Sequence, residues 1–500
     1  MSKTLGDTLA GASTDDQLKE KCAVFGVYNP SDTPTHIHDT ARIAYYGLWA
    51  LQHRGQESSG IATSDGTMIH CHTGSGLVAT AYQEEDLAEL PGTIAIGHNR
   101  YSTSGGADAV HNQPYINAKH QIALAHNGNL PDVSQLQAFL DTRKIAHEQM
   151  NDSAMMLAAI CAHLDDGLEL TKAITAAYPL LSGAFSVVVA TKTQLVAFRD
   201  ECGLRPLALG SLADGGYTVA SETCAFDTIG AEFVREINPG EMVTIDANGV
   251  SSQQIVPARP RADIFELVYF ARPDSMLIGK RVDIIRQEFG RQLARETQID
   301  ADVVVPVPDS AVPAAIGFSQ QSGIPFEMAL IKNRYIHRTF IRPTSTMREH
   351  DLKMKLNPIR ESIEGQRVVL VDDSIVRGST MRHLVAMVRR AGAREIHLLI
   401  TSPPILYPDF YGINTPTQNE LIAATMDKDE ICNYLGSDSL FYLSQEGMVA
   451  ATGLEASVLS MSCFDGQYPI SIGKRIDEIK PVDFKYSDTN IIKTSPRSGV

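Results

Sequence analysis

One short segment, VVLVDDSIVRGST at residues 368–380, constrains the fold of this chain more than any other feature. Its first residues are apolar and mostly β-branched, which is typical of a strand buried in a parallel sheet. Asp372 and Asp373 follow that strand, and the loop SIVRGST then leads into an amphipathic helix. Because open α/β sheets bind ligands at the carboxyl ends of their strands, the segment predicts a doubly wound parallel sheet with a ligand site at this loop.

The loop has the composition of a site for a phosphate monoester. Gly378 and the backbone N–H groups at the start of the helix can donate hydrogen bonds to an anion, which the helix dipole also favours. The hydroxyl groups of Ser374, Ser379 and Thr380 add further donors, and the two aspartates would then meet sugar hydroxyls or a hydrated Mg²⁺. An ordinary connection with a solvated Asp-Asp turn is the alternative, while the P-loop and dinucleotide-binding patterns are both absent.

Hydrophobic patterning divides the chain into two main units. Before about residue 250, short β-type runs with glycine and asparagine turns alternate with helical stretches, which predicts an α+β or layered α/β/β/α unit. After the proline-containing segment 256–261, helical and strand patterns alternate, which predicts a parallel sheet. The helical spacing there includes Val282, Ile285, Phe289 and Leu293. The predicted parts are a removable leader (propeptide) at 1–21, domains at 22–258 and 259–470, and a polar tail at 471–500.

Composition and charge restrict the possible partners and the compartment. With 43 Lys and Arg against 59 Asp and Glu, the 500-residue chain carries a net charge of −16, which disfavours nucleic acids and anionic membranes as partners. No apolar stretch approaches the roughly 18–20 residues of a membrane-spanning helix. The scattered cysteines contain no CxxC pair, which argues against a disulfide framework and a thiolate metal site and favours a reducing cytoplasm.

Cys22 stands at the start of an apolar run, CAVFGVY, directly after the polar leader. A cysteine in such a position is more commonly a small buried hydrophobic residue. If residues 1–21 are removed, however, Cys22 carries a free α-amino group with a pKa of about 7.7–8.0, which can take the proton of the thiol. The sequence therefore offers a nucleophile and a base in one residue.

Three later segments contain residues suited to assist a cysteine that cleaves an amide. Asn127 and Gly128 can stabilise a tetrahedral oxyanion through a side-chain amide and a backbone N–H group. Arg100 is suited to a bidentate contact with an α-carboxylate, and Asp152 to a contact with an α-ammonium group, so the substrate would be an amino acid such as glutamine. Each has an alternative when taken alone: Asn-Gly is a common hairpin signal, Asp152 can cap a helix, and Arg100 can form a surface ion pair.

Two segments add to the candidate phosphate site. Asp309 and Ser310 end the apolar strand ADVVVPVP and are suited to a pyrophosphate group and its metal. Residues 332–341, KNRYIHRTFI, form a basic and aromatic loop, for which the alternative is a solvated surface turn. Beside a diphosphate site, this loop becomes a candidate closing lid.

Together with QHRGQE at residues 52–57, the segments of the first half are similar to the glutaminase domain of N-terminal-nucleophile amidotransferases. The string at 368–380 resembles the ribose-5-phosphate-binding signature of the phosphoribosyltransferases. From Cys22 to about residue 470, the chain resembles the glutamine phosphoribosylpyrophosphate amidotransferase family. Further shared segments are GLRPL at 203–207, ASET at 220–223 and RPDS at 272–275.

This resemblance implies a fold and a reaction. The fold would be an N-terminal-nucleophile (αββα) glutaminase domain followed by a doubly wound phosphoribosyltransferase domain. Cys22 would attack the amide of glutamine, and the released ammonia would displace pyrophosphate from phosphoribosylpyrophosphate to give 5-phosphoribosylamine, the first committed step of purine synthesis. Catalysis would rest on Cys22, Asn127 and Gly128, and glutamine binding on Arg54, Arg100 and Asp152.

The resemblance also assigns residues that join the two sites or bind the sugar. Tyr101, Lys332, Asn333, Arg334, Tyr335 and Arg338 would form the ammonia route and couple the sites. Phosphoribosylpyrophosphate would contact Asp309, Ser310, Asp372, Asp373, Ser374, Arg377, Gly378, Ser379 and Thr380. Ser310, Asp372 and Asp373 would hold the Mg²⁺ cofactor.

Departures from the family pattern lie beside matched positions. Ala23 follows the nucleophile where glycine is usual, and Asn99 precedes Arg100 where an apolar residue is common. Some relatives bind an iron–sulfur cluster on four cysteines, but the corresponding segments here retain only Cys463, so no cluster is expected. Relatives are homotetramers or homodimers that purine nucleotides inhibit, and the resemblance extends both properties to this chain.

Two other functions fit parts of the sequence. A regulator could bind phosphoribosylpyrophosphate without catalysis, or an enzyme with a similar first domain could transfer ammonia to a different sugar. The intact pyrophosphate and lid segments argue against the regulator, and the phosphoribosyl motif argues against the other acceptor.

Overall fold

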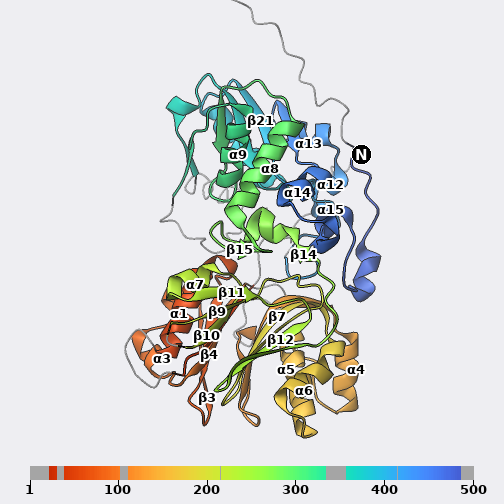
Figure 1. Ribbon diagram of the computed structural model, residues 1–500. Coiled ribbons are helices and arrows are strands. Elements are labelled where there is room, and N and C mark those ends of the chain that lie inside the picture. The colour runs from red at the N-terminus through yellow and green to blue at the C-terminus, as the bar shows by residue number, and fades with distance from the viewer. Residues whose placement is uncertain are drawn as a thin grey trace, which may run out of the picture.

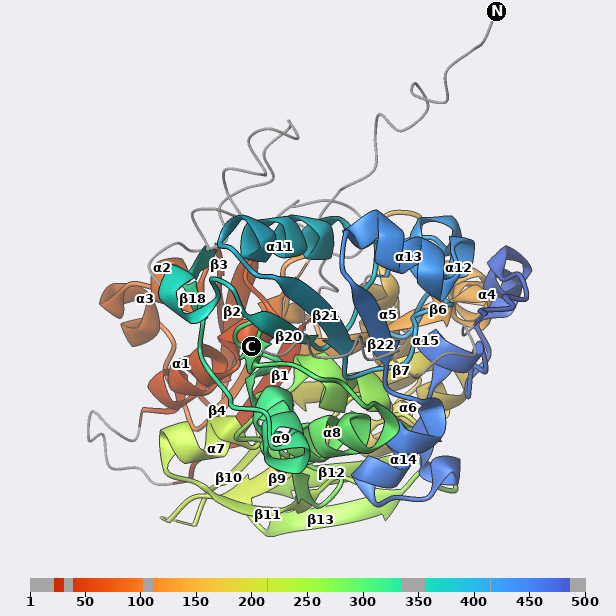
Figure 2. The same cartoon turned by 90° about the horizontal axis from the view of Figure 1, so that it is seen from above.

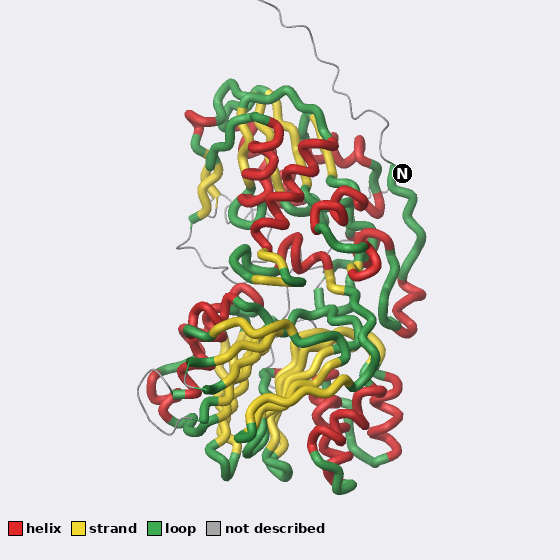
Figure 3. Tube along the Cα trace, in the orientation of Figure 1, coloured by secondary structure: helices red, strands yellow, loops and turns green. Residues whose placement is uncertain are grey.

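Two β-sheets face each other in the first half of the chain (Figure 1, Figure 3). The computed structural model describes residues 22–30, 39–101, 111–213, 215–333, 356–413 and 415–485. The first sheet has the strand order β11-β9-β10-β1-β4-β2-β3, and the second has the order β13-β12-β8-β7-β6-β5.

These elements have the following bounds. The strands of the first sheet are β1 (Ala23–Tyr28), β2 (Ser58–Ser64), β3 (Ile69–Ser75), β4 (Ile94–Arg100), β9 (Ala208–Ser211), β10 (Tyr217–Ala220) and β11 (Glu232–Glu236). Those of the second are β5 (Tyr115–Asn117), β6 (Ile122–Asp132), β7 (Ser182–Ala190), β8 (Leu195–Arg199), β12 (Glu241–Asp246) and β13 (Gly249–Gln254). The helices beside the first sheet are α1 (Thr40–Ala50), α2 (Val78–Ala81), α3 (Glu84–Ala88) and α7 (Cys224–Ile229), and those beside the second are α4 (Ser134–Thr142), α5 (Asp152–Asp165) and α6 (Leu170–Ala177).

Alternating apolar side chains build the layers of this half. On β1, Val24 joins the core between the two sheets, whereas Phe25 packs with the residues of α1 and α7. On β7, Val188 lies in the same inner core, and its neighbours Val187 and Val189 pack with α5 and α6. Because successive side chains of a strand point to opposite faces, each sheet is buried on both sides. The result is the α/β/β/α arrangement that the sequence predicts.

A parallel sheet with the strand order β17-β20-β21-β22 forms the centre of the second half. Its strands are β17 (Val303–Pro306), β20 (Arg367–Asp372), β21 (Glu395–Ile400) and β22 (Ser439–Tyr442). Figure 2 shows α8 (Val282–Glu296), α9 (Val312–Ser322) and α14 (Gln445–Thr452) on one side of the sheet, with α11 (Ser379–Arg390) and α13 (Lys428–Leu435) on the other. The four apolar residues that predicted a helix all lie on the buried face of α8. The doubly wound sheet is therefore confirmed.

Shorter elements connect these layers. They are β14 (Ala262–Asp263), β15 (Met276–Leu277), β16 (Lys280–Arg281), β18 (Leu330–Lys332), β19 (Leu356–Pro358), β23 (Leu459–Ser460), α12 (Ile422–Thr425), α15 (Ser462–Asp465) and a π-helix at Glu266–Phe270. Short 3₁₀ segments occur at Gln52–Arg54, Tyr178–Leu180, Arg360–Ser362, Gln418–Glu420, Ala456–Val458 and Gly473–Glu478. In the part of the chain that the structure describes, every helix is too short or too polar to cross a bilayer.

A cluster of buried charges joins the two halves, and we call it the boundary charge cluster. Arg54 is fully buried, and its guanidinium group pairs with Glu222 of the first half and Glu266 of the second. Arg205 pairs with the same Glu266 at 3.0 Å and with Asp263 at 2.6 Å. Burial raises the pKa of Asp263 to about 7. Because these side chains are almost completely shielded from water, each charge depends on its partners.

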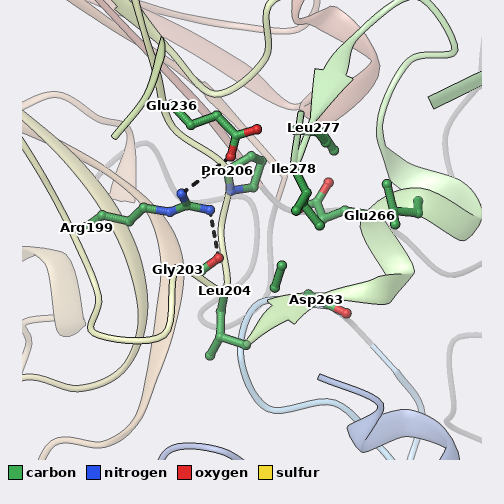
Figure 4. Close-up of a pocket in the computed structure, with 11 residues that line it drawn as sticks. Arg199, Gly203, Leu204, Pro206, Glu236, Asp263, Glu266, Leu277 and Ile278 are labelled. Carbon is green, nitrogen blue, oxygen red and sulfur yellow. Dashed lines mark hydrogen bonds and ion pairs between the residues drawn. The ribbon is translucent and has the colours of Figure 1, made fainter. Parts of the chain in front are cut away.

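A small cavity lies against this cluster, and residues from both halves line it (Figure 4). Asp263 and Glu266 come from the segment that opens the second half. On the other side, Arg199 donates a hydrogen bond to the carbonyl oxygen of Gly203 at 2.7 Å and lies 4.0 Å from the carboxylate of Glu236. The charged side chains that line the cavity are thus mainly paired with other groups of the protein.

Replacement of Arg54 by methionine should lower the stability of the protein sharply. The variant keeps much of the side-chain volume but leaves Glu222 and Glu266 buried without their shared cation, a change that costs about 3–5 kcal/mol. Thermal unfolding followed by circular dichroism measures the loss. Arg143→Met is the matched control, because Arg143 forms a half-exposed pair with Asp166, and ion pairs in contact with water contribute little to stability. Equal losses in the two variants would contradict the expectation.

Candidate functional site

Cys22 is buried and directly precedes β1. Its backbone N–H group donates a hydrogen bond to the carbonyl oxygen of Arg54 at 3.2 Å. Two residues later, the N–H group of Val24 donates to the hydroxyl oxygen of Ser221 at 2.9 Å, and the N–H group of Ser221 donates back to the carbonyl oxygen of Val24 at 3.0 Å. The backbone on either side of the candidate nucleophile is therefore held in place.

Asn127 and Gly128 lie inside β6 and pair with β7, rather than forming a hairpin turn. The side-chain amide of Asn127 contacts the hydroxyl of Ser221 at 3.3 Å, the same hydroxyl that holds β1 just after Cys22. Gly128 has a φ of 147°, and a Cβ atom there would lie 2.0 Å from the carbonyl oxygen of Ala184. Only glycine fits this position, and the fold brings the predicted oxyanion pair close to the start of β1.

Arg100 ends β4 and is mostly buried. Strands β1 and β4 are antiparallel, with Ala23 opposite Asn99, so Arg100 and Cys22 stand at adjacent ends of neighbouring strands. The guanidinium group of Arg100 lies 3.5 Å from the side-chain oxygen of Asn112. Arg100, the predicted carboxylate-binding residue, and Cys22, the candidate nucleophile, therefore lie at the same end of the first sheet.

The two departures from the family pattern fit into this sheet. Ala23 is fully buried within β1. The Asn99 amide group is also buried, but it donates to the carbonyl oxygen of Leu48 at 2.7 Å and accepts from the hydroxyl of Ser59 at 2.9 Å. Since both ends of this amide have partners, a polar residue is accommodated where an apolar one is common.

Asp152 is the first residue of α5, while the side chain of Asn151 caps that helix by accepting from the N–H group of Ala154. The Asp152 carboxylate accepts a hydrogen bond from the backbone N–H group of Leu130 at 3.1 Å. Leu130 lies two residues after Gly128 on β6. The predicted ammonium-binding carboxylate therefore lies beside the strand that carries the predicted oxyanion donors. It also accepts from the backbone N–H group of Ser153 at 2.8 Å, in the first turn of α5.

A buried polar chain supports this part of the site. Nδ1 of His126 lies 2.9 Å from the hydroxyl oxygen of Ser153, which in turn lies 3.3 Å from the Asp152 carboxylate. The backbone N–H group of His126 donates to the side-chain oxygen of Gln113 at 2.7 Å. Burial lowers the pKa of His126, so its imidazole is neutral. Sequence reasoning missed this chain, because a lone histidine and a lone serine carry no motif.

The loop at residues 374–380, which we call the phosphate loop, has the predicted form. Asp372 is the last residue of β20, and α11 begins at Ser379 without a side-chain cap on its first turn. Gly378 adopts a left-handed φ of 80°, and a Cβ atom there would lie 2.7 Å from the Cδ1 atom of Ile422. The N–H group of Ile422 donates to the carbonyl oxygen of Val376 at 2.9 Å. The loop is therefore braced by α12, and the first N–H groups of α11 remain suited to an anion.

Two adjacent carboxylates dominate the electrostatics of this loop. The Asp373 carboxylate accepts hydrogen bonds from the hydroxyls of Ser310 at 2.5 Å and Ser374 at 2.7 Å. Burial and the charge of Asp373 raise the pKa of Asp372 well above its usual value, and burial also raises the pKa of Asp373. Two such carboxylates repel one another when both are ionised, and a bound divalent cation relieves that repulsion.

The donor set at this loop consists of oxygen atoms, which is the chemistry that fits Mg²⁺. The described residues contain no group of three or more His, Cys, Asp and Glu side chains arranged to hold a metal. Two carboxylates and one hydroxyl leave several coordination positions for water and substrate oxygens, which is how Mg²⁺ is commonly bound.

Lys332 ends β18, at the start of the candidate lid, and donates to the Asp309 carboxylate at 2.8 Å. Both side chains are half-exposed. The pyrophosphate segment and the first lid residue therefore lie together, with Asn333 next in the chain, while Tyr101 directly follows β4 in the first half. Arg334, Tyr335 and Arg338 lie outside the described residues, as do residues 1–21.

Two charged residues near the phosphate loop carried no signal in the sequence. Glu420 accepts from the guanidinium group of Arg377 at 3.1 Å. Arg286 is buried on α8, donates to the carbonyl oxygens of Leu267 and Ala271 at 2.8 Å each, and favours the ionised form of Asp373. Both come from segments distant in sequence from residues 368–380, so no local spacing could have identified them.

Family comparisons match both halves of the chain. A model of the glutamine amidotransferase domain matches residues 98–228, and a model of the phosphoribosyl transferase domain matches residues 278–402. The first match contains Arg100, Asn127, Gly128 and Asp152, and the second contains Asp309, Ser310 and the phosphate loop.

Individual relatives extend the similarity over most of the chain. The chain is 46% identical to the amidophosphoribosyltransferase of Synechocystis sp. over 473 residues, covering 93% of this chain and 94% of that protein. It is 42% identical to the amidophosphoribosyltransferase of Bacillus subtilis, covering 91% of this chain and 95% of that protein.

Two solved structures are also similar. One is the glutamine phosphoribosylpyrophosphate amidotransferase of B. subtilis complexed with ADP and GMP, with a TM-score of 0.83, 41% identity and coverage of 91% of this chain and 98% of that chain. The other is described as the allosteric regulatory enzyme of purine biosynthesis, with a TM-score of 0.84, 40% identity and coverage of 92% and 99%.

Proposed function

Because the chain belongs to the amidophosphoribosyltransferase family, we propose that its two candidate centres carry the two half-reactions of that enzyme. The chain is a glutamine-dependent transferase that catalyses the first step of purine biosynthesis. The assignment of residues is supported above all by one observation. The start of β1 pairs with the end of β4, and Asn127 of β6 contacts the same Ser221 hydroxyl that accepts from Val24, two residues after Cys22.

In the first half-reaction, the Cys22 thiolate attacks the amide carbon of glutamine, and the C–N bond breaks as the leaving nitrogen takes a proton. Water then hydrolyses the thioester, which releases glutamate and restores the thiol. After removal of residues 1–21, the free α-amino group of Cys22 would take the thiol proton and pass it to the leaving ammonia. The contact between the nitrogen of Cys22 and the carbonyl oxygen of Arg54 supports this role, because it fixes that nitrogen beside the thiol.

Asn127 and the N–H group of Gly128 would stabilise the oxyanion of the tetrahedral intermediate. The side-chain oxygen of Asn127 is buried and has no hydrogen-bond partner among the described residues. The Ser221 hydroxyl already accepts from Val24 and has a proton of its own to donate. A half-turn of the Asn127 amide would pair its oxygen with that proton and direct its nitrogen toward the substrate.

Arg100 would bind the α-carboxylate of glutamine, and Asp152 its α-ammonium group. The predicted contact of Arg54 with glutamine stays a prediction. Its guanidinium group lies in the boundary charge cluster, and the part of Arg54 that reaches Cys22 is its carbonyl oxygen.

Asp152→Asn should raise the KM for glutamine by about 10–100-fold, because a charge-assisted hydrogen bond contributes about 1.5–3 kcal/mol. The asparagine side chain can still accept from the N–H group of Leu130, so the fold should be kept. Initial rates of glutamate formation at varied glutamine measure the effect. Asp165→Asn, at the exposed far end of α5, is the control. An unchanged KM in the Asp152 variant would remove this residue from the glutamine site.

In the second half-reaction, ammonia attacks C1 of phosphoribosylpyrophosphate as the bond from C1 to the pyrophosphate oxygen breaks. Ser374, Arg377, Gly378, Ser379 and Thr380 would hold the 5-phosphate, with Asp309 and Ser310 beside the pyrophosphate group. Ser310, Asp372 and Asp373 would hold Mg²⁺, which when bound neutralises the leaving pyrophosphate. The raised pKa of Asp372 supports this assignment, since the pair gains most from a nearby cation.

Ammonia must travel between the centres unprotonated, because the ammonium ion that dominates in neutral water is not a nucleophile. We propose Tyr101, Lys332, Asn333, Arg334, Tyr335 and Arg338 for this route, together with closure of the loop that begins at Lys332. The contact between Lys332 and Asp309 supports this, as it places the start of the loop at the pyrophosphate segment.

Purine nucleotides are proposed as regulators, since the similar B. subtilis enzyme was solved with ADP and GMP. A homodimer or homotetramer in the cytoplasm is proposed as well. The exposed Tyr46 and Trp49 of α1 are consistent with such an assembly.

Mg²⁺ is proposed as the metal cofactor, without an iron–sulfur cluster. Of the segments that correspond to the cluster-binding ones, the first supplies Asp263, which is paired with Arg205, and Cys463 is buried nearby.

The domain limits at 22–258 and 259–470 remain a proposal. Their support is that β13 ends at Gln254 and β14 begins at Ala262.

The test is glutamate release from glutamine by the purified chain with Mg²⁺, in the presence and absence of phosphoribosylpyrophosphate. Strong stimulation by the sugar diphosphate is expected, because both centres belong to one reaction. An intact mass measurement establishes whether residues 1–21 have been removed. If the chain that begins at Cys22 releases no glutamate under either condition, the proposed assignment of Cys22 is wrong.

A further inference from the structure

Asn129 forms a hydrogen bond between the two halves of the chain. It follows Gly128 on β6, and its side-chain nitrogen donates to the carbonyl oxygen of Phe410 at 2.7 Å. The pairing of β6 with β7 shifts register between Asn129 and Asp132, so the sheet holds the strand less regularly from this residue onward. The contact with Phe410 therefore fixes β6 just after the proposed oxyanion pair.

Phe410 belongs to a connection at residues 401–413, directly after β21, which we call the bridging loop. Its tip has a defined shape, because the Asp409 carboxylate accepts from the backbone N–H groups of Tyr411 at 2.8 Å and Ile413 at 2.9 Å. Gly412 has a φ of 136°, and a Cβ atom there would lie 3.6 Å from the Cα atom of Gly128. The tip of the bridging loop is therefore packed against the glycine of the proposed oxyanion pair.

The other end of the bridging loop begins at the proposed metal site. Thr401 donates to the carbonyl oxygen of Asp372 through its backbone N–H group at 3.0 Å and through its hydroxyl at 3.3 Å. The preceding residue, Ile400, pairs with Asp372 in the parallel sheet. Thr401 and Ser402 are both buried. One continuous, largely buried segment thus runs from the backbone of Asp372 to Gly128.

We infer that the bridging loop couples the two centres and that Asn129 is the positioning residue through which the coupling reaches the oxyanion donors. This inference rests on the proposed function of both centres. A ligand shifts an equilibrium only if it interacts differently with the two arrangements. Binding of phosphoribosylpyrophosphate and Mg²⁺ at Asp372 favours one position of Thr401, and the hydrogen bond of Asn129 carries that preference to the N–H group of Gly128.

The test compares glutamate release with and without phosphoribosylpyrophosphate for the wild type and for Asn129→Leu, each beginning at Cys22. Leucine has the same branched shape as asparagine, with two methyl groups in place of the amide oxygen and nitrogen, and it cannot donate to Phe410. The stimulation ratio should fall at least about fivefold, the lower end of usual coupling effects. Unstimulated glutamate release and ammonia-dependent synthesis should stay near wild-type values, because Asn129 is not among the residues proposed to bind either substrate. Asn248→Leu, on an exposed turn, is the control.

Each outcome separates this inference from the function on which it rests. A wild-type ratio in Asn129→Leu overturns the inference and leaves the proposed function intact. Absence of glutamate release by the wild type overturns the proposed function itself. If Asn129→Leu also loses ammonia-dependent synthesis, Asn129→Ala replaces it, because alanine has no donor for Phe410 and adds no volume. A wild-type ratio in that variant is equally decisive against the role of Asn129.

Discussion

Cys22→Ser is expected to abolish glutamine-dependent synthesis and to spare synthesis from ammonia. A serine hydroxyl stays protonated at neutral pH and is a much weaker nucleophile than a thiolate, so the glutaminase rate should fall by at least about 10³-fold. The phosphate loop and its carboxylates lie in the other half of the chain and are untouched. Pyrophosphate release, measured with glutamine and then with an ammonium salt at high pH, gives both rates from one preparation.

The matched control for this variant is Cys71→Ser on β3, since Cys71 is exposed and lies away from β1 in the sheet order. It should keep both activities. Loss of both activities in a Cys22→Ser protein that still unfolds cooperatively would refute the division of labour between two centres. Full retention of glutamine use would exclude Cys22 as the nucleophile.

Asp372→Asn is expected to reduce synthesis by at least about 10²-fold with either nitrogen source, because synthesis from glutamine and synthesis from ammonia would share the proposed Mg²⁺ and phosphoribosylpyrophosphate site at this residue. Stability should not fall. The asparagine oxygen can still accept from the N–H group of Asp373, and the substitution removes one of two mutually repelling carboxylates. Pyrophosphate release and thermal unfolding of the same sample measure the two effects.

Asp302→Asn should give the opposite result. Asp302 precedes β17, at the end of the sheet away from the phosphate loop, and its hydrogen bonds with Arg367 lower its pKa to about 2. Its replacement should lower stability while activity is kept. If Asp372→Asn and Asp302→Asn both lose stability and keep activity, Asp372 has a structural role and the metal site lies elsewhere.

The second half of the fold could be predicted from the sequence because its signals are local. The apolar run before Asp372 and the spacing of Val282, Ile285, Phe289 and Leu293 each lie within one element, and the structure confirms both elements. A parallel sheet then requires the phosphate loop to lie at the carboxyl edge, where the structure has it. Gly378 is a further local signal. The chain turns into α11 at this residue, and the turn uses a left-handed conformation that glycine adopts readily.

The arrangement of the first centre depended instead on contacts between distant segments. Asn127 and Gly128 carry the pattern of a hairpin turn, yet pairing with β7 places both within a strand. Ser221, which links the start of β1 to Asn127, is an ordinary serine in sequence. Arg54 lies in a motif that suggested glutamine binding, whereas its side chain meets Glu266, a residue more than two hundred positions later. Such long-range pairing has no local pattern.

The boundary charge cluster has a consequence for how the chain is made. Arg205 is buried against Asp263 and Glu266, which come from the segment after the last strand of the glutaminase sheets. While the protein is being synthesised from its N-terminus, the ion pairs of Arg205 with this segment cannot both form until the ribosome has released residue 266. The glutaminase half therefore gains these two ion pairs only after the segment that opens the second half has been synthesised. Assembly of the boundary charge cluster is thus coupled to synthesis of the segment that opens the second half.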